Sequence, residues 1–143
     1  MEAWKEIEAR WVEGTVFEGF NSENGEVLMG ELDGKSGLAP MEMLLAGLAG
    51  CTGIDVVLIL GKKRQIPEDF KVKVRAKRAD KHPKVYTEIE IEYLFWGDNL
   101  TDKAIQQAIL LSEDKYCSVS AMLSKTAKIS SSYQIMPITE EKK

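Results

Sequence analysis

The chain has 143 residues, the size of one ordinary domain, so we expect one hydrophobic core and a single domain over residues 1–143. Hydrophobic residues make up 44% and charged residues 29% of the chain, a balance typical of soluble globular proteins. The net charge of −4 argues against a nucleic-acid partner, because phosphate binding requires a basic surface.

The amino-terminal residues alternate charged and apolar side chains, and they lack the basic start and apolar run of a secretory signal. We therefore expect a cytoplasmic protein. The two cysteines, Cys51 and Cys117, should stay reduced in that compartment, so we expect buried or reactive thiols and no structural disulfide. Composition does not decide whether the two cysteines are inert or reactive.

Strand-forming sequence dominates the first third of the chain. Residues 6–20 and 26–32 are rich in β-branched and aromatic residues, and the Asn-Gly pair at 24–25 is a strong hairpin signal. The pattern predicts an antiparallel meander.

One long helix is predicted over residues 40–64. Pro40 suits a first helical turn, and Glu42 complements the positive end of the helix. Gly61 and the basic residues 62–64 mark the other end, where positive charge complements the negative pole.

The interior of this helix, residues 43–60, is nearly apolar. A membrane span needs ~20 such residues, and this shorter run also contains Asp55, so we expect no membrane partner. A helix buried on all sides in a soluble protein fits better.

Three glycines recur along the helix, at Gly47, Gly50 and Gly53. Their low helix propensity is usually tolerated where another backbone approaches closely. The strands of one chain can cover one side of the helix, so we expect a second copy to cover the other side in a homodimer.

Two half-buried strands are predicted on either side of a hairpin at His82-Pro83. Apolar and charged residues alternate over 70–77 and again over 88–95. Folding the hairpin gives the pairs Lys77–Glu88, Arg75–Glu90 and Lys73–Glu92, with Val74 facing Ile91 on the other face. We interpret these charges as a solvated sheet face held by cross-strand pairs, and not as a binding surface.

The last third predicts a helix, a corner, a short helix and a strand. Thr101 can cap the first of these helices, residues 112–116 form the corner, a short helix begins at Cys117, and the last strand spans 128–135. Residues 137–143 are expected to form a disordered tail. The predicted class is α+β.

The predicted positions of the two thiols imply different pKa values. A helix N-terminus at Cys117 lowers a thiol pKa, whereas apolar surroundings raise the pKa of Cys51 unless a cation approaches. Asp55, one helical turn after Cys51, opposes thiolate formation unless it is neutralised.

Two stretches together resemble the OsmC/Ohr family. They are "LAPMEMLLAGLAGCTGIDVVLIL" at 38–60 and "LSEDKYCSVSAML" at 111–123, and the similarity extends from about residue 8 to residue 135. Within the family the chain is most similar to the YhfA-like branch. The resemblance implies an OsmC-like fold, in which antiparallel sheets wrap around long central helices in an intertwined homodimer.

The resemblance also implies thiol-dependent reduction of organic hydroperoxides, as protection against oxidative stress. Cys51 would attack the peroxide and become a sulfenic acid, and Cys117 would resolve it as a disulfide. A small external thiol or dithiol would reduce that disulfide, so no cofactor is expected. The alternative is that both cysteines are small buried hydrophobic residues.

The sequence departs from the family at the activating pair. Family peroxidases place a glutamate directly after the proline, paired with an arginine from the first-strand region, whereas this chain has Met41 there and the carboxylate at Glu42. The nearest arginine is Arg10, either a substitute cation or a strand residue that pairs with a glutamate. We take Cys51, Cys117, Glu42 and Arg10 as the candidate catalytic residues.

Other functions stay open. A hotdog-like thioesterase would use Asp55 or Glu42 as its base, and a non-catalytic OsmC-like protein would bind small apolar or thiol ligands. A zinc site would need Cys51, Cys117, His82 and a carboxylate to converge, and no pair of these residues has the spacing of a zinc finger, so we expect no metal.

Overall fold

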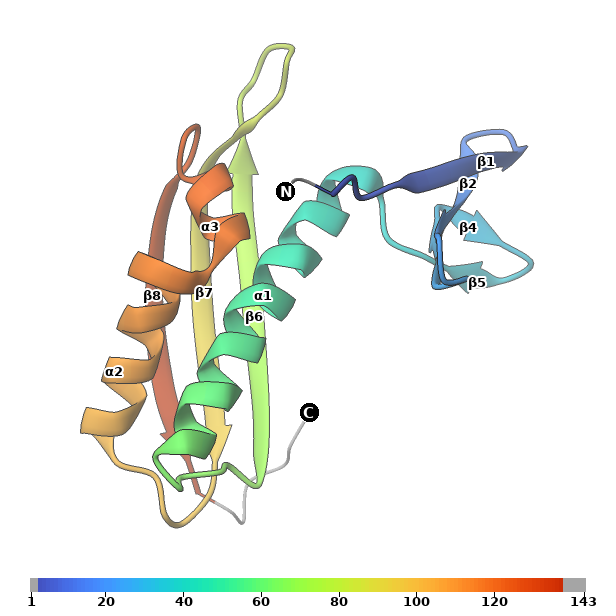
Figure 1. Cartoon of the computed structure of the whole chain (residues 1–143). Coiled ribbons are helices and arrows are strands. Elements are labelled where there is room, and N and C mark those ends of the chain that lie inside the picture. The colour runs from blue at the N-terminus through green and yellow to red at the C-terminus, as the bar shows by residue number, and fades with distance from the viewer. Residues whose placement is uncertain (1–2, 138–143) are drawn as a thin grey trace. The chain divides into compact units, whose positions relative to one another are not determined.

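The computed structural model describes residues 3–137, and the chain divides into two compact units, Met1–Leu44 and Leu45–Lys143 (Figure 1). The expectation of a single domain stays a prediction. Apart from Pro137, the expected tail lies outside the described residues.

The first unit contains the predicted meander. Strands β1 (Ile7–Glu13), β2 (Val16–Asn21) and β3 (Glu26–Met29) form an antiparallel sheet in the order β1-β2-β3, followed by the two-stranded ribbon of β4 (Glu31–Leu32) and β5 (Lys35–Ser36). Residues 6–20 contribute β1 and most of β2. The chain turns at Gly14, whose φ of 51° is available to glycine at little cost.

The hairpin between β2 and β3 forms at the predicted Asn-Gly pair. Asn24 has a φ of 65°, and Asn21 Oδ1 accepts the backbone N–H groups of Glu23 and Gly25 at 2.9 and 2.8 Å. Asparagine favours such turns because its side chain can bond to nearby backbone amides.

The second unit is a three-stranded sheet with helices on one face (Figure 1). In chain order its elements are α1 (Pro40–Lys62), which leads in from the first unit, β6 (Asp69–Arg78), β7 (Tyr86–Trp96), α2 (Asp102–Leu111), the π-helical turn η1 (Ser112–Tyr116), α3 (Ser118–Leu123) and β8 (Lys128–Met136). The α+β class is confirmed.

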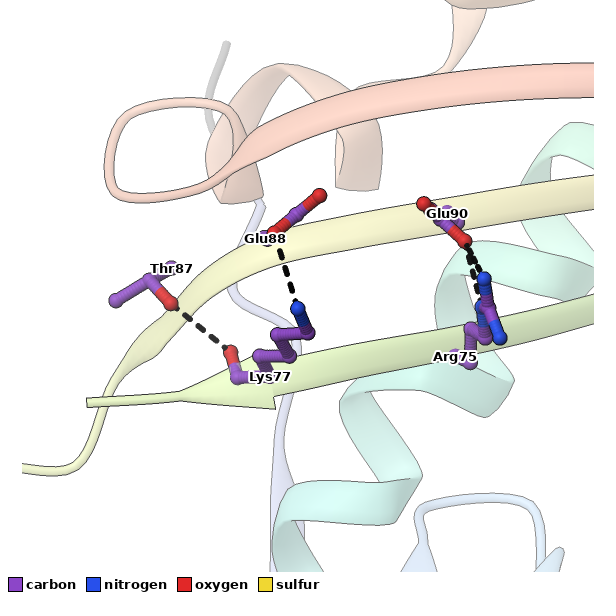
Figure 2. A network of polar contacts seen from close by, with 5 residues as sticks. All are labelled: Arg75, Lys77, Thr87, Glu88 and Glu90. Atoms are coloured by element: carbon purple, nitrogen blue, oxygen red, sulfur yellow. Dashed lines mark hydrogen bonds and ion pairs between the residues drawn. The ribbon is translucent and has the colours of Figure 1, made fainter. Parts of the chain in front are cut away.

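The register of β6 and β7 is the one predicted from charge. Lys77 pairs with Glu88, Arg75 with Glu90, Lys73 with Glu92 and Val74 with Ile91. Figure 2 shows the Arg75–Glu90 ion pair and the longer Lys77–Glu88 pair at 3.8 Å. All four of these charged side chains are well exposed, so each pair contributes only ~0.2–1 kcal/mol and chiefly selects the register.

Strand β8 pairs with β7 in parallel, so the sheet is mixed and not wholly antiparallel. The residues between these strands form α2, η1 and α3, and a crossover of this length returns the chain in the same direction. Thr101 caps α2 as predicted, since its Oγ1 accepts the N–H of Ala104 at 3.3 Å.

Helix α1 buries one stripe and exposes another. Leu48, Thr52, Val56 and Leu60 are buried, at intervals of one helical turn, whereas Ile54 is 63% exposed. The expectation that α1 is buried on all sides is wrong for a single copy of the chain, because the described residues of the second unit cover only one side of this helix. By length and composition α1 is also able to cross a membrane, a property that it shares with core helices of soluble proteins.

The face of α1 that carries Gly47, Gly50 and Gly53 is largely uncovered in the second unit. Among the described residues, a Cβ atom added at Gly47 or Gly50 meets nothing within 4 Å, and one added at Gly53 meets Val72 Cγ2 at 3.5 Å. Gly50 and Gly53 line an open apolar hollow of about 480 Å³ beside β6. Within the described part of the second unit, no neighbouring backbone atom lies within 4 Å of a Cβ added at these glycines, so the close neighbour that they predict is not found there.

Candidate thiol site

Two thiols and a carboxylate converge in the second unit. The Sγ atoms of Cys51 and Cys117 and a carboxylate oxygen of Asp55 all lie within 4.8 Å of one another. Cys51 and Asp55 share a face of α1 because they are four residues apart. Both cysteines are free, and Cys117 is buried while Cys51 is half-buried.

Cys117 reaches this position through η1. The N–H of Cys117 donates to Ser112 O at 2.7 Å, an i→i+5 bond that inserts one wide turn between α2 and α3. Cys117 then caps α3, and its Sγ accepts the N–H of Ser120 at 3.3 Å. The sequence predicts the corner and the helix start, whereas the π-helical turn that connects them has no signal in the sequence pattern.

Ser112 is the partner of Asp55 that sequence analysis missed. Its hydroxyl is fully buried and donates to Asp55 Oδ2 at 2.9 Å. The bond holds one carboxylate oxygen of Asp55 and joins α1 to the start of η1. The two residues are 57 positions apart, so no local pattern could have revealed the pair.

Burial raises the pKa of the Cys117 thiol to about 11, and the nearby Cys51 adds to that rise. The N–H of Ser120 acts in the opposite direction but is outweighed. The expectation of a lowered pKa at this helix start was therefore wrong. Helix α3 is only six residues long, so its N-terminus stabilises a thiolate weakly. Cys117 is 3% exposed, and the desolvation of its thiol therefore determines the direction of the pKa change.

A hydrogen-bonded group of side chains lies near Cys117. The Tyr93 hydroxyl donates to Glu113 Oε2 at 2.8 Å, and Ser131 donates to Glu113 Oε1 at 3.1 Å. Burial first and then the charge of Glu113 raise the pKa of Tyr93 far above its ordinary value, with a further contribution from Cys117. Tyr93 therefore stays protonated and serves as a neutral donor.

Two of the other candidate residues, Glu42 and Arg10, belong to the first unit, and His82 belongs to the second. Glu42 Oε1 accepts the N–H of Ala39 at 2.8 Å, one half of a capping box at the start of α1. Arg10 is exposed on β1 and lies opposite Glu18 on β2. His82 is exposed in the loop between β6 and β7, outside the thiol cluster. The catalytic roles of Arg10 and Glu42 remain predictions.

The two thiol-bearing segments lie inside the region that matches a known family. The family model described as OsmC-like protein matches residues 32–132. The chain belongs to the OsmC-like protein family. The resemblance predicted from the two sequence stretches is thereby confirmed, and with it the OsmC-like fold class.

One curated protein and one protein of solved structure are similar to the chain over most of its length. Protein YhfA of Escherichia coli K12 is 39% identical over 127 residues, which cover 89% of this chain and 95% of YhfA. A crystal structure of a hypothetical protein from Aquifex aeolicus VF5 has 41% identity and a TM-score of 0.85, covering 99% of this chain and 100% of that one.

A more distant structural neighbour has a name that describes a function. The organic hydroperoxide resistance protein OhrB of Bacillus subtilis has a TM-score of 0.63 and 12% identity, over 92% of this chain and 98% of OhrB. At that identity the likeness concerns the fold alone.

Proposed function

We propose that the protein is a thiol-dependent peroxidase that reduces organic hydroperoxides to alcohols. The observation that carries the proposal is the convergence of Cys51 and Cys117, whose sulfur atoms lie within 4.8 Å. A disulfide bond is about 2.05 Å long, so the sulfurs need to approach by less than about 3 Å to bond. Membership of a family that includes proteins described as organic hydroperoxide resistance proteins supports this chemistry.

In the first step the Cys51 thiolate attacks one oxygen of the hydroperoxide. The S–O bond forms as the O–O bond breaks, and the departing alkoxide takes up a proton to leave as an alcohol. Sulfur is oxidised to sulfenic acid while the peroxide is reduced. Cys51 is assigned this role because it is the more accessible of the two thiols.

In the second step Cys117 attacks the sulfenic sulfur of Cys51. The S–S bond forms, the S–O bond breaks, and the hydroxyl leaves as water with the proton of Cys117. The high pKa of Cys117 suits a resolving thiol that stays protonated until the sulfenic acid forms beside it. An external thiol or dithiol of the cytoplasm then reduces the disulfide by exchange.

A homodimer completes the proposed enzyme. The exposed side of α1 presents Ile54, Val57 and Leu58, together with the open positions at Gly47 and Gly50. A second copy of the chain would cover this apolar face, since small residues permit close helix packing. The expected substrates of the assembly are small organic hydroperoxides.

Intact-mass analysis tests the proposal directly. The reduced protein is treated with one equivalent of cumene hydroperoxide in the presence of a chelator and is analysed under non-reducing conditions. We expect the loss of two hydrogen masses per chain and a Cys51–Cys117 linked peptide. Persistence of both free thiols while the peroxide remains unconsumed would refute the proposal.

Single variants separate the two roles. Cys51→Ser should abolish peroxide consumption, because a hydroxyl cannot become a sulfenic acid. Cys117→Ser should allow one round of attack and leave Cys51 as a sulfenic acid that dimedone labels. Ser118→Ala, next to Cys117 and exposed, is the control and should turn over normally. Dimedone on Cys117 in the Cys51→Ser variant, with none on Cys51 in the reciprocal variant, would reverse the assignment.

A further inference from the structure

The thiol site contains more donor chemistry than the peroxidase cycle uses. Two sulfur atoms and a carboxylate oxygen converge within 4.8 Å, although the cycle requires only the sulfurs. Thiolate and carboxylate are ligands that Zn²⁺ accepts. The sequence spacing did not predict a metal, because Cys117 is 66 residues from Cys51 and reaches it only in the folded chain.

We propose that Cys51, Asp55 and Cys117 bind a thiophilic divalent cation of the Zn²⁺ type. The binding site does not depend on the peroxidase activity proposed above. A tetrahedral Zn²⁺ with Zn–S bonds of about 2.3 Å and Zn–O bonds of about 2.1 Å holds its ligand atoms roughly 3.5–3.8 Å apart. From a present spacing of at most 4.8 Å, the donors therefore need to approach one another by about 1.3 Å or less.

The surroundings orient the donors. Ser112 donates to Asp55 Oδ2 and so constrains that carboxylate, and Ser120 donates its N–H to the sulfur of Cys117. Outer partners of this kind position metal ligands. Cys51 and Asp55 are fixed on one face of α1, in the i, i+4 relation that recurs among helical metal ligands.

Charge also favours a cation. Thiolates and a carboxylate are anionic ligands, and the three donors meet in a small and partly buried space. A divalent cation offsets most of this charge and displaces the thiol protons. Three protein ligands leave a fourth position for water or a small thiol, so the site is of the open type and not a closed structural finger.

Cobalt(II) is the probe for this site, because tetrahedral thiolate coordination produces a charge-transfer band in the near ultraviolet. Reduced full-length protein is titrated with Co²⁺, and then with Zn²⁺. We expect saturation at one ion per chain and loss of the band when Zn²⁺ displaces Co²⁺. Absence of the band at several equivalents of Co²⁺ would overturn the proposal.

Variants identify the ligands. Cys51→Ser and Cys117→Ser should each lose about half of the charge-transfer intensity, and Asp55→Asn should keep the band but bind Co²⁺ more weakly. Ser112→Ala, which removes the outer partner, should weaken binding by roughly 10–100-fold. His82→Ala is the control, since this exposed histidine lies outside the cluster, and it should bind as the wild type does.

A measurement without substitutions guards against misfolded variants. Blocking the thiols of the wild type with methyl methanethiosulfonate should abolish the band, and reductant should restore it. Binding that survives the block, that disappears in His82→Ala, or that is unchanged in Asp55→Asn would overturn the three-ligand site. None of these readouts requires peroxide turnover, so a failed peroxidase and a failed metal site give different results.

Discussion

Replacing Ser112 with alanine tests the link between α1 and η1. The Ser112 hydroxyl is fully buried, and it donates to Asp55 Oδ2 at 2.9 Å. The substitution removes one hydroxyl, leaves the backbone of η1 unchanged, and deprives the half-buried carboxylate of this donor. We expect a clear loss of stability.

The expected loss of unfolding free energy follows from the fact that Ser112 donates to a carboxylate. A hydrogen bond to a charged group contributes roughly 1.5–3 kcal/mol, and the partial exposure of Asp55 favours the lower half of that range, about 2 kcal/mol. The entropy of unfolding near the midpoint scales with chain length, so a 143-residue protein should lose about 7 °C in Tm. Ser131→Ala is the matched control: Ser131 is exposed and bonds to Glu113, so its loss should stay within about 0.5 kcal/mol.

Urea unfolding of metal-free, reduced protein at a fixed protein concentration measures both variants, because assembly makes apparent stability depend on concentration. A double-mutant cycle with Asp55→Asn isolates the pair, and we expect a coupling of about 1–2 kcal/mol. Equal stabilities for Ser112→Ala and Ser131→Ala, or no coupling to Asp55, would refute the reasoning.

Three further predictions concern assembly, register and core. Gly50→Leu should convert the proposed dimer to aggregates or unfolded chain in light scattering, because over-packing at a close helix contact is not relieved locally. Gly61→Ala, near the end of the helix, should leave the assembly intact. A monodisperse dimer of Gly50→Leu would contradict the proposed contact. Arg75→Glu should lower the free energy of unfolding in urea by about 0.5–1 kcal/mol, because it breaks the ion pair with Glu90. The double variant Arg75→Glu, Glu90→Arg should recover most of this loss. An equal loss in the double variant would show that the two side chains do not couple. Ile105→Ala should lower the free energy of unfolding by about 2–5 kcal/mol, because this side chain on α2 is fully buried and its removal leaves a cavity. A loss below about 1 kcal/mol would show that the neighbouring side chains close the cavity.

The sequence alone determined the elements whose cause is local. Charge and apolarity agree on a single pairing of β6 with β7, and the structure has that pairing. Thr101 caps α2, Pro40 begins α1, and the Asn-Gly pair makes its turn, since each residue acts on backbone within a few positions. The two quoted stretches were enough to identify the family before any distance was known.

Tertiary structure decided what depends on groups distant in sequence. The parallel pairing of β8 follows from the path of the crossover, and the bond from Ser112 to Asp55 joins residues that only folding brings together. The raised pKa of Cys117 reverses the local expectation, because desolvation is a property of the whole neighbourhood and outweighs one N–H donor at a short helix. The convergence of two sulfurs and a carboxylate likewise depends on tertiary structure. Helix α1 presents Cys51 and Asp55, and the π-helical turn, many residues later in the chain, positions Cys117 beside them.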